Sequence, residues 1–219
     1  MKNINTKYLR WGIIVSLICA LIIFIYSFAL GKEKSFLLLN NDWGKMADLF
    51  FSSVTYLGDG IVWLAVLLIT WLILKRKDAI LLLFFTFLCS TIIAQLFKYV
   101  IAPNVLRPIK YISDPALIHM VPGVELHTVS SFPSGHATTA FSIYLFFCLL
   151  LKSRWWLILG LIYSLIVAYS RIYLAQHFPE DIAGGIIAAI LSVTISYIIV
   201  QKINYHKNQN KVQNGNKIS

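Results

Sequence analysis

The chain has 219 residues, of which 58% are hydrophobic and only 13% are charged. This composition excludes an ordinary soluble domain and is typical of a small membrane protein with several spans. The net charge of +10 does not indicate a nucleic-acid partner, because the basic residues stand in short clusters between apolar runs, where they set topology and contact lipid headgroups. The cysteines have no metal-ligand or disulfide spacing, so we expect small core residues at Cys19, Cys89 and Cys148.

The first apolar run, residues 11–31, follows a basic N-terminal segment. It exceeds the roughly 7–15 apolar residues of a signal peptide, so we expect an uncleaved first helix. Beyond it, apolar residues recur at near-helical spacing in residues 36–57, and an interfacial helix over residues 36–50 or an irregular loop would both produce this pattern. The recurring residues are Trp43, Met46, Leu49, Phe50, Val54 and Leu57.

A membrane-spanning helix needs about 20 mostly apolar residues. We therefore predict an all-α bundle of six transmembrane helices in one domain, residues 1–201, with Asp59 near the outer end of the second helix. The polar, basic residues 202–219 predict a disordered cytoplasmic tail. The six apolar runs are 11–31, 53–74, 79–97, 133–151, 155–170 and 182–201.

The positions of the basic residues predict the orientation of the bundle. With both termini in the cytoplasm, 12 of the 19 Lys and Arg residues lie inside. The loop 99–132 and the turn 171–181 then both face outward, so we expect a multi-pass membrane protein whose functional site opens to the outside. The inside residues are Lys2, Lys7, Arg10, Lys75, Arg76, Lys77, Lys152, Arg154, Lys202, Lys207, Lys211 and Lys217.

His177 is a candidate nucleophile. It precedes Phe178 and Pro179, and Pro is favoured at the first position of a helix, so we expect the sixth helix to begin there. Asp181 then lies in the first turn and can reach back to the imidazole. A carboxylate on one ring nitrogen fixes the tautomer and leaves the other nitrogen free to attack.

The segment Pro133-Ser134-Gly135-His136 opens the fourth helix. Ser134 is a favourable N-cap, and Gly135 permits close approach to the backbone. The free N–H groups at such a helix start bind anions, which would hold His136 beside a bound phosphate as a general acid. Three further cations can contact phosphate oxygens, namely Lys98, Arg107 and Arg171.

Together these residues closely resemble the three signature motifs of the type 2 phosphatidic acid phosphatase (PAP2) superfamily, whose members include bacterial membrane lipid phosphatases. The second and third motifs match in full, including the five residues between Arg171 and His177 and the three between His177 and Asp181. The first motif departs from the pattern, because eight residues rather than six separate Lys98 from Arg107. We expect the helix that carries Lys98 to end before Pro103, and a turn to take up the surplus.

The resemblance implies a phosphatase that acts through a phosphohistidine at His177, with Asp181 as its orienting group and His136 as the acid for the leaving group. It assigns phosphate binding to Lys98, Arg107, Ser134, Gly135 and Arg171, and it requires no metal or other cofactor. The resemblance also implies a bacterial cytoplasmic membrane as the location of the protein. The substrates it implies are membrane lipids, namely undecaprenyl diphosphate, phosphatidylglycerol phosphate, phosphatidate or lipid A phosphate.

Two other functions fit the same residues. One is a lipid phosphotransferase that passes the phosphoryl group to an acceptor lipid, and the other is a non-enzymatic transporter that retains an anion site. The sequence leaves the substrate and the oligomeric state open. It also leaves open whether four polar residues of the outer loop contact a headgroup, namely Asp114, His119, Glu125 and His127.

Overall fold

The computed structural model describes residues 6–151 and 153–215, and every regular element in these ranges is helical. The predicted all-α class is therefore confirmed. Three basic residues counted on the cytoplasmic side, Lys2, Lys152 and Lys217, lie outside the described residues. The longer helices are α1 (Thr6–Leu30), α3 (Lys45–Val54), α4 (Val62–Leu68), α5 (Ile80–Leu96), α7 (Gly135–Leu150), α8 (Arg154–Tyr173) and α9 (Pro179–Gly215), and the short ones include α2 (Lys32–Leu37) and α6 (Pro108–Tyr111).

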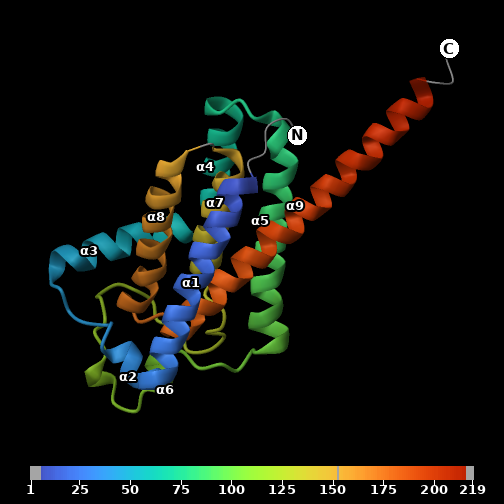
Figure 1. Cartoon of the computed structure of the whole chain (residues 1–219). Coiled ribbons are helices and arrows are strands. Elements are labelled where there is room, and N and C mark those ends of the chain that lie inside the picture. Colours follow the sequence, from blue (N-terminus) through green and yellow to red (C-terminus); the bar gives the residue numbers. More distant parts are fainter. Residues whose placement is uncertain (1–5, 152, 216–219) are drawn as a thin grey trace.

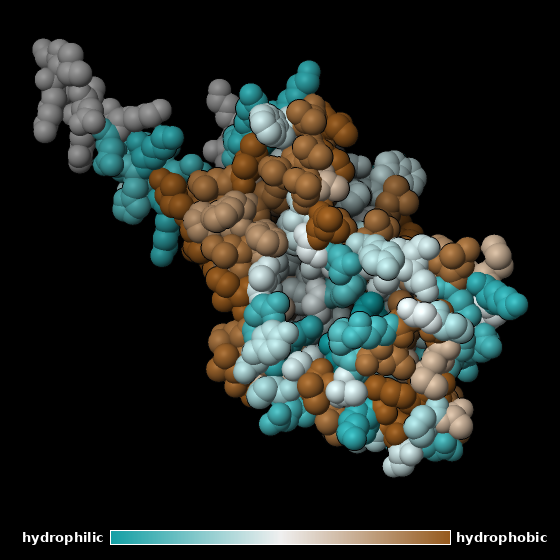
Figure 2. Space-filling view, turned by 180° about the vertical axis from the view of Figure 1, so that it is seen from behind, coloured by the Kyte–Doolittle hydropathy of each residue, from teal (hydrophilic) through white to brown (hydrophobic). Residues whose placement is uncertain are grey.

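Helix α7 is the centre of the bundle. Every side chain from Ala140 to Leu150 is buried, and α1, α5, α8 and α9 pack around this helix. The outward faces of the surrounding helices are apolar as well, with Ile22 61% exposed and Phe28 82% exposed. Figure 2 shows apolar side chains over much of one face, while hydrophilic side chains gather toward the end that carries the loops. An apolar exterior of this extent is the surface of a protein surrounded by lipid.

Four helices are long and apolar enough to cross a membrane: Thr6–Leu30, Lys77–Ile101, Arg154–Tyr173 and Pro179–Asn210. The pair Lys45–Gly58 and Val62–Ile73, bent by 63°, counts as a fifth if both parts form one span. Helix α7 corresponds to the run 133–151, but with 16 residues it is shorter than a typical span. The structure thus contains a helix for each predicted run, while length and composition alone identify four or five spans.

The second predicted span, residues 53–74, is wrong as a continuous helix. The chain breaks after the 3₁₀ turn Thr55–Gly58, and α4 begins only at Val62. Asp59 lies at this break with extended backbone angles instead of inside the helix. The sequence Gly58-Asp59-Gly60 explains the break, because Gly and Asp are both poor helix formers.

The segment 36–50 contains both a loop and a helix. Residues 40–44 have no regular structure, and α3 then runs from Lys45 to Val54 across the bundle (Figure 1). Met46 and Leu49 are exposed on α3, whereas Phe51 is buried. Helix α3 therefore presents apolar side chains outward, and it covers only the later part of the segment 36–50.

The predicted disorder of the tail is also not found over residues 202–215, because α9 remains helical through Gly215. Figure 1 shows the C-terminal part of α9 projecting from the bundle. No Pro or Gly interrupts the chain between Lys202 and Asn214, so each added residue extends an existing helix without the cost of a new nucleus.

The two histidine segments lie at the same end of the bundle. Figure 1 places the start of α1 and the end of α9 at one end, and the loop between α6 and α7 and the turn between α8 and α9 at the other. The prediction that both segments share one face of the protein is therefore confirmed.

Candidate active site

His177 and Asp181 form a buried pair, 1% and 0% exposed. Helix α9 begins at Pro179 as predicted, and this places Asp181 in its first turn with Oδ2 3.3 Å from Nδ1 of His177. The same Oδ2 accepts hydrogen bonds from the Ser131 hydroxyl at 2.5 Å and from the Phe178 N–H at 2.9 Å. Three donors therefore converge on one carboxylate oxygen, which fixes the carboxylate relative to the imidazole.

Arg107 determines which nitrogen of His177 is free. Its Nη1 lies 3.5 Å from Nε2 of His177. A guanidinium only donates and a carboxylate only accepts, so Nδ1 carries the proton and Nε2 holds the lone pair. Burial lowers the pKa of His177 well below its usual value, and the positive charges of Arg107 and Arg171 lower it further. The imidazole is therefore neutral near pH 7, the state that a nucleophile requires.

The backbone holds Arg107 in place. Its guanidinium donates to the carbonyl oxygens of Val129, Ser130 and Gln176, at 3.0, 3.4 and 3.0 Å. These carbonyls belong to the loop before α7 and to the turn after α8. Arg107 thus joins both segments of the site, and it is only 5% exposed.

The turn after α8 brings His177 back toward Arg171. Ala175 adopts a left-handed conformation with φ of 53°, and the N–H groups of Gln176 and His177 both donate to the carbonyl of Arg171. This closure resembles the C-terminal motif in which a left-handed residue ends a helix. It sets the five-residue spacing between Arg171 and His177 seen in the sequence.

His136 stands at the start of α7 with Ser134 as the N-cap, as predicted. Nε2 of His136 lies 3.1 Å from Oδ1 of Asp59, which identifies the partner of this carboxylate that the sequence did not reveal. Gly58 makes the contact possible, because a Cβ atom at this position would lie 2.9 Å from the Cβ of His136. The break between α3 and α4 is therefore part of the site.

A second glycine lets α9 approach the segment that opens α7. A Cβ atom on Gly185 would lie 2.7 Å from the carbonyl oxygen of Ser134. The N–H of Ser134 in turn donates to the carbonyl of Asp181 at 3.0 Å. The histidine segments of the second and third motifs are thus joined directly through their backbones.

Lys98 reaches the same place from α5. Its Nζ would be 3.6 Å from a Cβ atom on Gly135, so the ammonium lies beside the start of α7. The helix ends at Ile101, before Pro103, as expected, and its last turn, Phe97–Ile101, is a π-helix. A π-turn accommodates one more residue than an α-turn, so the wide turn helps to absorb the surplus between Lys98 and Arg107.

Arg171 is buried at the end of α8 and lacks a full set of partners. Its Nη1 donates to the hydroxyl of Thr55 at 2.6 Å, and its Nε–H has no hydrogen-bond partner among the described residues. A buried guanidinium donor without a partner is costly unless a ligand satisfies it. This donor therefore fits an anion in the site. No sequence pattern pointed to Thr55.

Asn40 was also missed by the sequence analysis. Its side chain is buried and donates to the carbonyl oxygens of Ile172 at 3.0 Å and Tyr173 at 2.9 Å, the last turn of α8. It also accepts from the N–H of His119 at 2.8 Å. One amide therefore joins the loop between α6 and α7 to the helix end that carries Arg171.

The four polar loop residues whose contact with a lipid headgroup the sequence left open have different surroundings. His119 Nε2 lies 3.0 Å from Asp48 Oδ1, Asp114 accepts from the Ala116 N–H, and the carbonyl of Glu125 accepts from Gln176. Asp42, Asp48 and His119 also bring their ligand atoms within 4.8 Å of one another, although the pairing of His119 with Asp48 accounts for this spacing. His127 is exposed.

Two known proteins resemble the chain along most of its length, and a third resembles about one third of it. The undecaprenyl-diphosphatase of Sulfolobus acidocaldarius is 28% identical over 206 residues, which cover 89% of this chain and 91% of that protein. The lipid A 4'-phosphatase of Bacteroides thetaiotaomicron is 32% identical over 72 residues, 33% of this chain and 32% of that protein. The crystal structure of Aquifex aeolicus LpxE is similar with a TM-score of 0.65 and 26% identity, covering 76% of this chain and 94% of that one.

The family profile that matches the chain, described as the PAP2 superfamily, spans residues 79–205. This range is more than half of the chain and contains each residue of the three motifs, from Lys98 to Asp181. The chain therefore belongs to the PAP2 superfamily.

Proposed function

We propose that this PAP2-type lipid phosphatase hydrolyses the terminal phosphate of a polyisoprenyl diphosphate through a phosphohistidine, without a metal ion. One observation carries the reaction class. Asp181 fixes Nδ1 of His177, while Nε2 faces the guanidinium of Arg107. A nucleophile with its orienting carboxylate on one side and a phosphate-binding cation on the other suits in-line attack on phosphorus.

The reaction has two steps. Nε2 of His177 attacks the phosphorus, the bond to the bridging oxygen breaks, and His136 gives the leaving oxygen a proton. Water then attacks the phosphohistidine, His136 takes its proton, and inorganic phosphate leaves. Arg107, Arg171 and Lys98 neutralise the charge on the phosphoryl oxygens in both steps, and the N–H groups at the start of α7 add donors.

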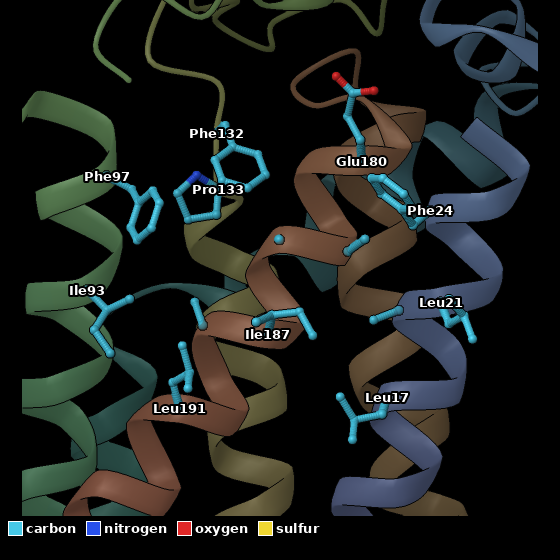
Figure 3. A pocket seen from close by; sticks show the side chains of 14 residues that line it. Leu17, Leu21, Phe24, Ile93, Phe97, Phe132, Pro133, Glu180, Ile187 and Leu191 are labelled. Carbon is cyan, nitrogen blue, oxygen red and sulfur yellow. The ribbon is translucent and has the colours of Figure 1, made fainter. Parts of the chain in front are cut away.

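The choice of substrate rests on the relatives and on a groove. The relative that corresponds to nearly the whole chain is an undecaprenyl-diphosphatase. An apolar groove of about 820 Å³ lies between α1, α5 and α9 and is lined by Leu21, Phe97 and Ile187 among others (Figure 3). It ends at Pro133, next to Ser134, so a lipid chain in the groove would bring its headgroup to the site.

A panel of purified lipids tests this function. With equal concentrations in detergent, a polyisoprenyl diphosphate should release phosphate fastest, ahead of phosphatidate, phosphatidylglycerol phosphate and lipid A. Turnover should persist with excess EDTA. No release from any lipid, loss of activity with EDTA, or transfer of the phosphoryl group to an added acceptor lipid in place of hydrolysis would contradict the proposal.

We also propose six spans with both termini in the cytoplasm, counting the bent pair α3–α4 as one span and the short α7 as another. The site then opens outward. In a background without Cys19, Cys89 and Cys148, an impermeant thiol reagent applied to intact cells should label Ala116→Cys but not Lys77→Cys. Labelling at position 77 but not at position 116 would show that the protein has the opposite topology.

Removal of the Lys98 ammonium should lower phosphate turnover. Lys98→Ala is expected to reduce kcat/KM about 10²-fold, because one preorganised donor to the transferring phosphoryl group is lost. Lys98→Arg should restore only part of the lost kcat/KM, since the planar guanidinium of arginine replaces the compact ammonium of lysine. The matched control is Lys110→Ala on α6, an exposed lysine beyond Arg107. Wild-type kcat/KM in Lys98→Ala together with a strongly reduced kcat/KM in Lys110→Ala would assign the phosphate-binding role to Lys110 instead.

Loss of the Asn40 amide should affect the site through Arg171. Asn40→Ala leaves the carbonyls of Ile172 and Tyr173 without their donor, so we expect kcat to fall about 10-fold and thermal stability to fall as well. Asn41→Ala is the matched control, because the Asn41 side chain is exposed and contacts only its own turn. Unchanged kcat in Asn40→Ala would show that the amide does not position Arg171.

A further inference from the structure

A charged pair stands at the end of the apolar groove nearest the site. Lys32 Nζ, at the start of α2, lies 2.6 Å from Glu180 Oε1 at the start of α9. Glu180 also lines the groove, and Figure 3 shows it at the end where α9 begins, above Phe24. Of the two residues, only Glu180 lines the groove, whereas Lys32 lines a separate pocket together with Gly31 and Tyr111.

The pair lies close to the segment that carries the proposed nucleophile. The Lys32 ammonium sits 4.4 Å from the centre of the Phe178 ring, and Phe178 directly follows His177. Its charge also acts on the carboxylate of Asp181. Lys32 is therefore a fourth cation near the site, although no motif contains it.

The position of a bound lipid determines which of its groups lies near Lys32. The groove is lined by Phe132 and Pro133, which lead into Ser134 at the start of α7. With the chain in the groove and the terminal phosphate at Ser134, the atoms between them lie at the end of the groove that Glu180 lines. In a diphosphate lipid, those atoms are the second phosphate.

The pair can exchange partners. Both side chains are partly exposed, Lys32 by 20% and Glu180 by 31%. The other carboxylate oxygen of Glu180 accepts a hydrogen bond from Ser27 at 3.2 Å, so Glu180 keeps a partner when Lys32 leaves. Lysine is a rotatable point charge that can turn to a phosphate oxygen without moving α2.

We propose that Lys32 binds the lipid-proximal phosphate of a diphosphate substrate, and that Glu180 holds Lys32 in its place until the substrate arrives. This inference rests on the proposed function and adds a specificity determinant to it. A lipid with a single phosphate has no group for Lys32, so it leaves the pair with Glu180 intact.

Three variants test the proposal with two ligands of the same chain length. The measured values are KM for a polyisoprenyl diphosphate and Ki of the matching monophosphate as a competitive inhibitor. Lys32→Met should raise KM about 10-fold, because one charge-assisted contact is lost, and change Ki less than about 3-fold. Lys32→Arg should have a KM and a Ki close to the wild-type values. Glu180→Gln should lower KM for the diphosphate, because Lys32 no longer has a competing carboxylate.

Lys34→Met is the matched control, since Lys34 is an exposed lysine on the same short helix. Equal changes in KM and Ki for Lys32→Met would overturn the proposal and give Lys32 a general or structural role. A higher KM in Glu180→Gln would overturn it too, and this variant decides the matter if Lys32→Met fails to fold. If wild type hydrolyses no polyisoprenyl diphosphate, the proposed function itself fails; normal wild-type turnover with unchanged Lys32 variants refutes only the role of Lys32.

Discussion

His177→Ala is expected to reduce phosphate release from a lipid substrate by at least about 10⁴-fold, because no other group can take over the attack on phosphorus. The described neighbours of Nε2 include the guanidinium of Arg107, which is permanently charged and cannot act as a nucleophile. The measurement is kcat of purified protein in detergent, with the wild type prepared alongside.

Folding of this variant can be checked separately. Asp181 keeps its hydrogen bonds from Ser131 and Phe178 when the imidazole is removed, so we expect the buried carboxylate to remain satisfied and the bundle to form. Thermal unfolding in detergent measures this directly. His127→Ala is the matched control, because His127 is an exposed histidine of the loop between α6 and α7, and its kcat should equal that of wild type. Near-normal turnover by folded His177→Ala would exclude His177 as the nucleophile.

Asp181→Asn should have the second largest effect, a fall in kcat of about 10³-fold. The amide can present its N–H₂ group to Nδ1 of His177, and the imidazole then places its proton on Nε2, where the lone pair is needed. Ser131 and Phe178 also lose a charged acceptor, so stability should fall as well. KM should change little, because the carboxylate does not contact the substrate.

The control for this variant is Asp114→Asn, which removes an exposed carboxylate from the loop between α6 and α7. It should leave kcat unchanged. If Asp181→Asn retained wild-type kcat while it lost stability, the carboxylate would have only a structural role.

Local rules made part of this site predictable. Ser134 caps α7 and Pro179 begins α9 because N-cap and first-turn preferences act within a few residues of the chain. The end of α5 before Pro103 follows from the same kind of local restriction. These short-range preferences, together with the motif spacing, were enough to identify His177 and Asp181 as neighbours and to place His136 at the start of α7.

Long-range partners were not predictable in this way. Asp59 pairs with His136, Thr55 with Arg171 and Asn40 with the end of α8, and each contact joins residues separated by more than 70 positions. A single polar residue in a loop carries no periodicity, so its partner follows only from packing. Ser131 lay near a motif, but nothing in the sequence separated it from the neighbouring Ser130.

The structure differs from the sequence-based expectation in two segments, for identifiable reasons. The apolar composition of residues 53–74 predicted one continuous helix. The poor helix propensity of Gly58-Asp59-Gly60 instead interrupts the helix there and places Asp59 next to His136. The polar composition of residues 202–215 indicated disorder, whereas attachment to the long apolar α9 removes the nucleation cost of a helix.

The most direct test of the proposed mechanism is capture of the phosphoenzyme. The protein is mixed with a polyisoprenyl diphosphate labelled with ³²P in the terminal phosphate, quenched in alkali within one turnover, and analysed for labelled phosphohistidine, which is stable to alkali and labile to acid. Label should appear on the peptide that contains His177 in wild type and be absent from His177→Ala. Turnover of wild type with no acid-labile label at any time point, or equal labelling of His177→Ala, would contradict the mechanism.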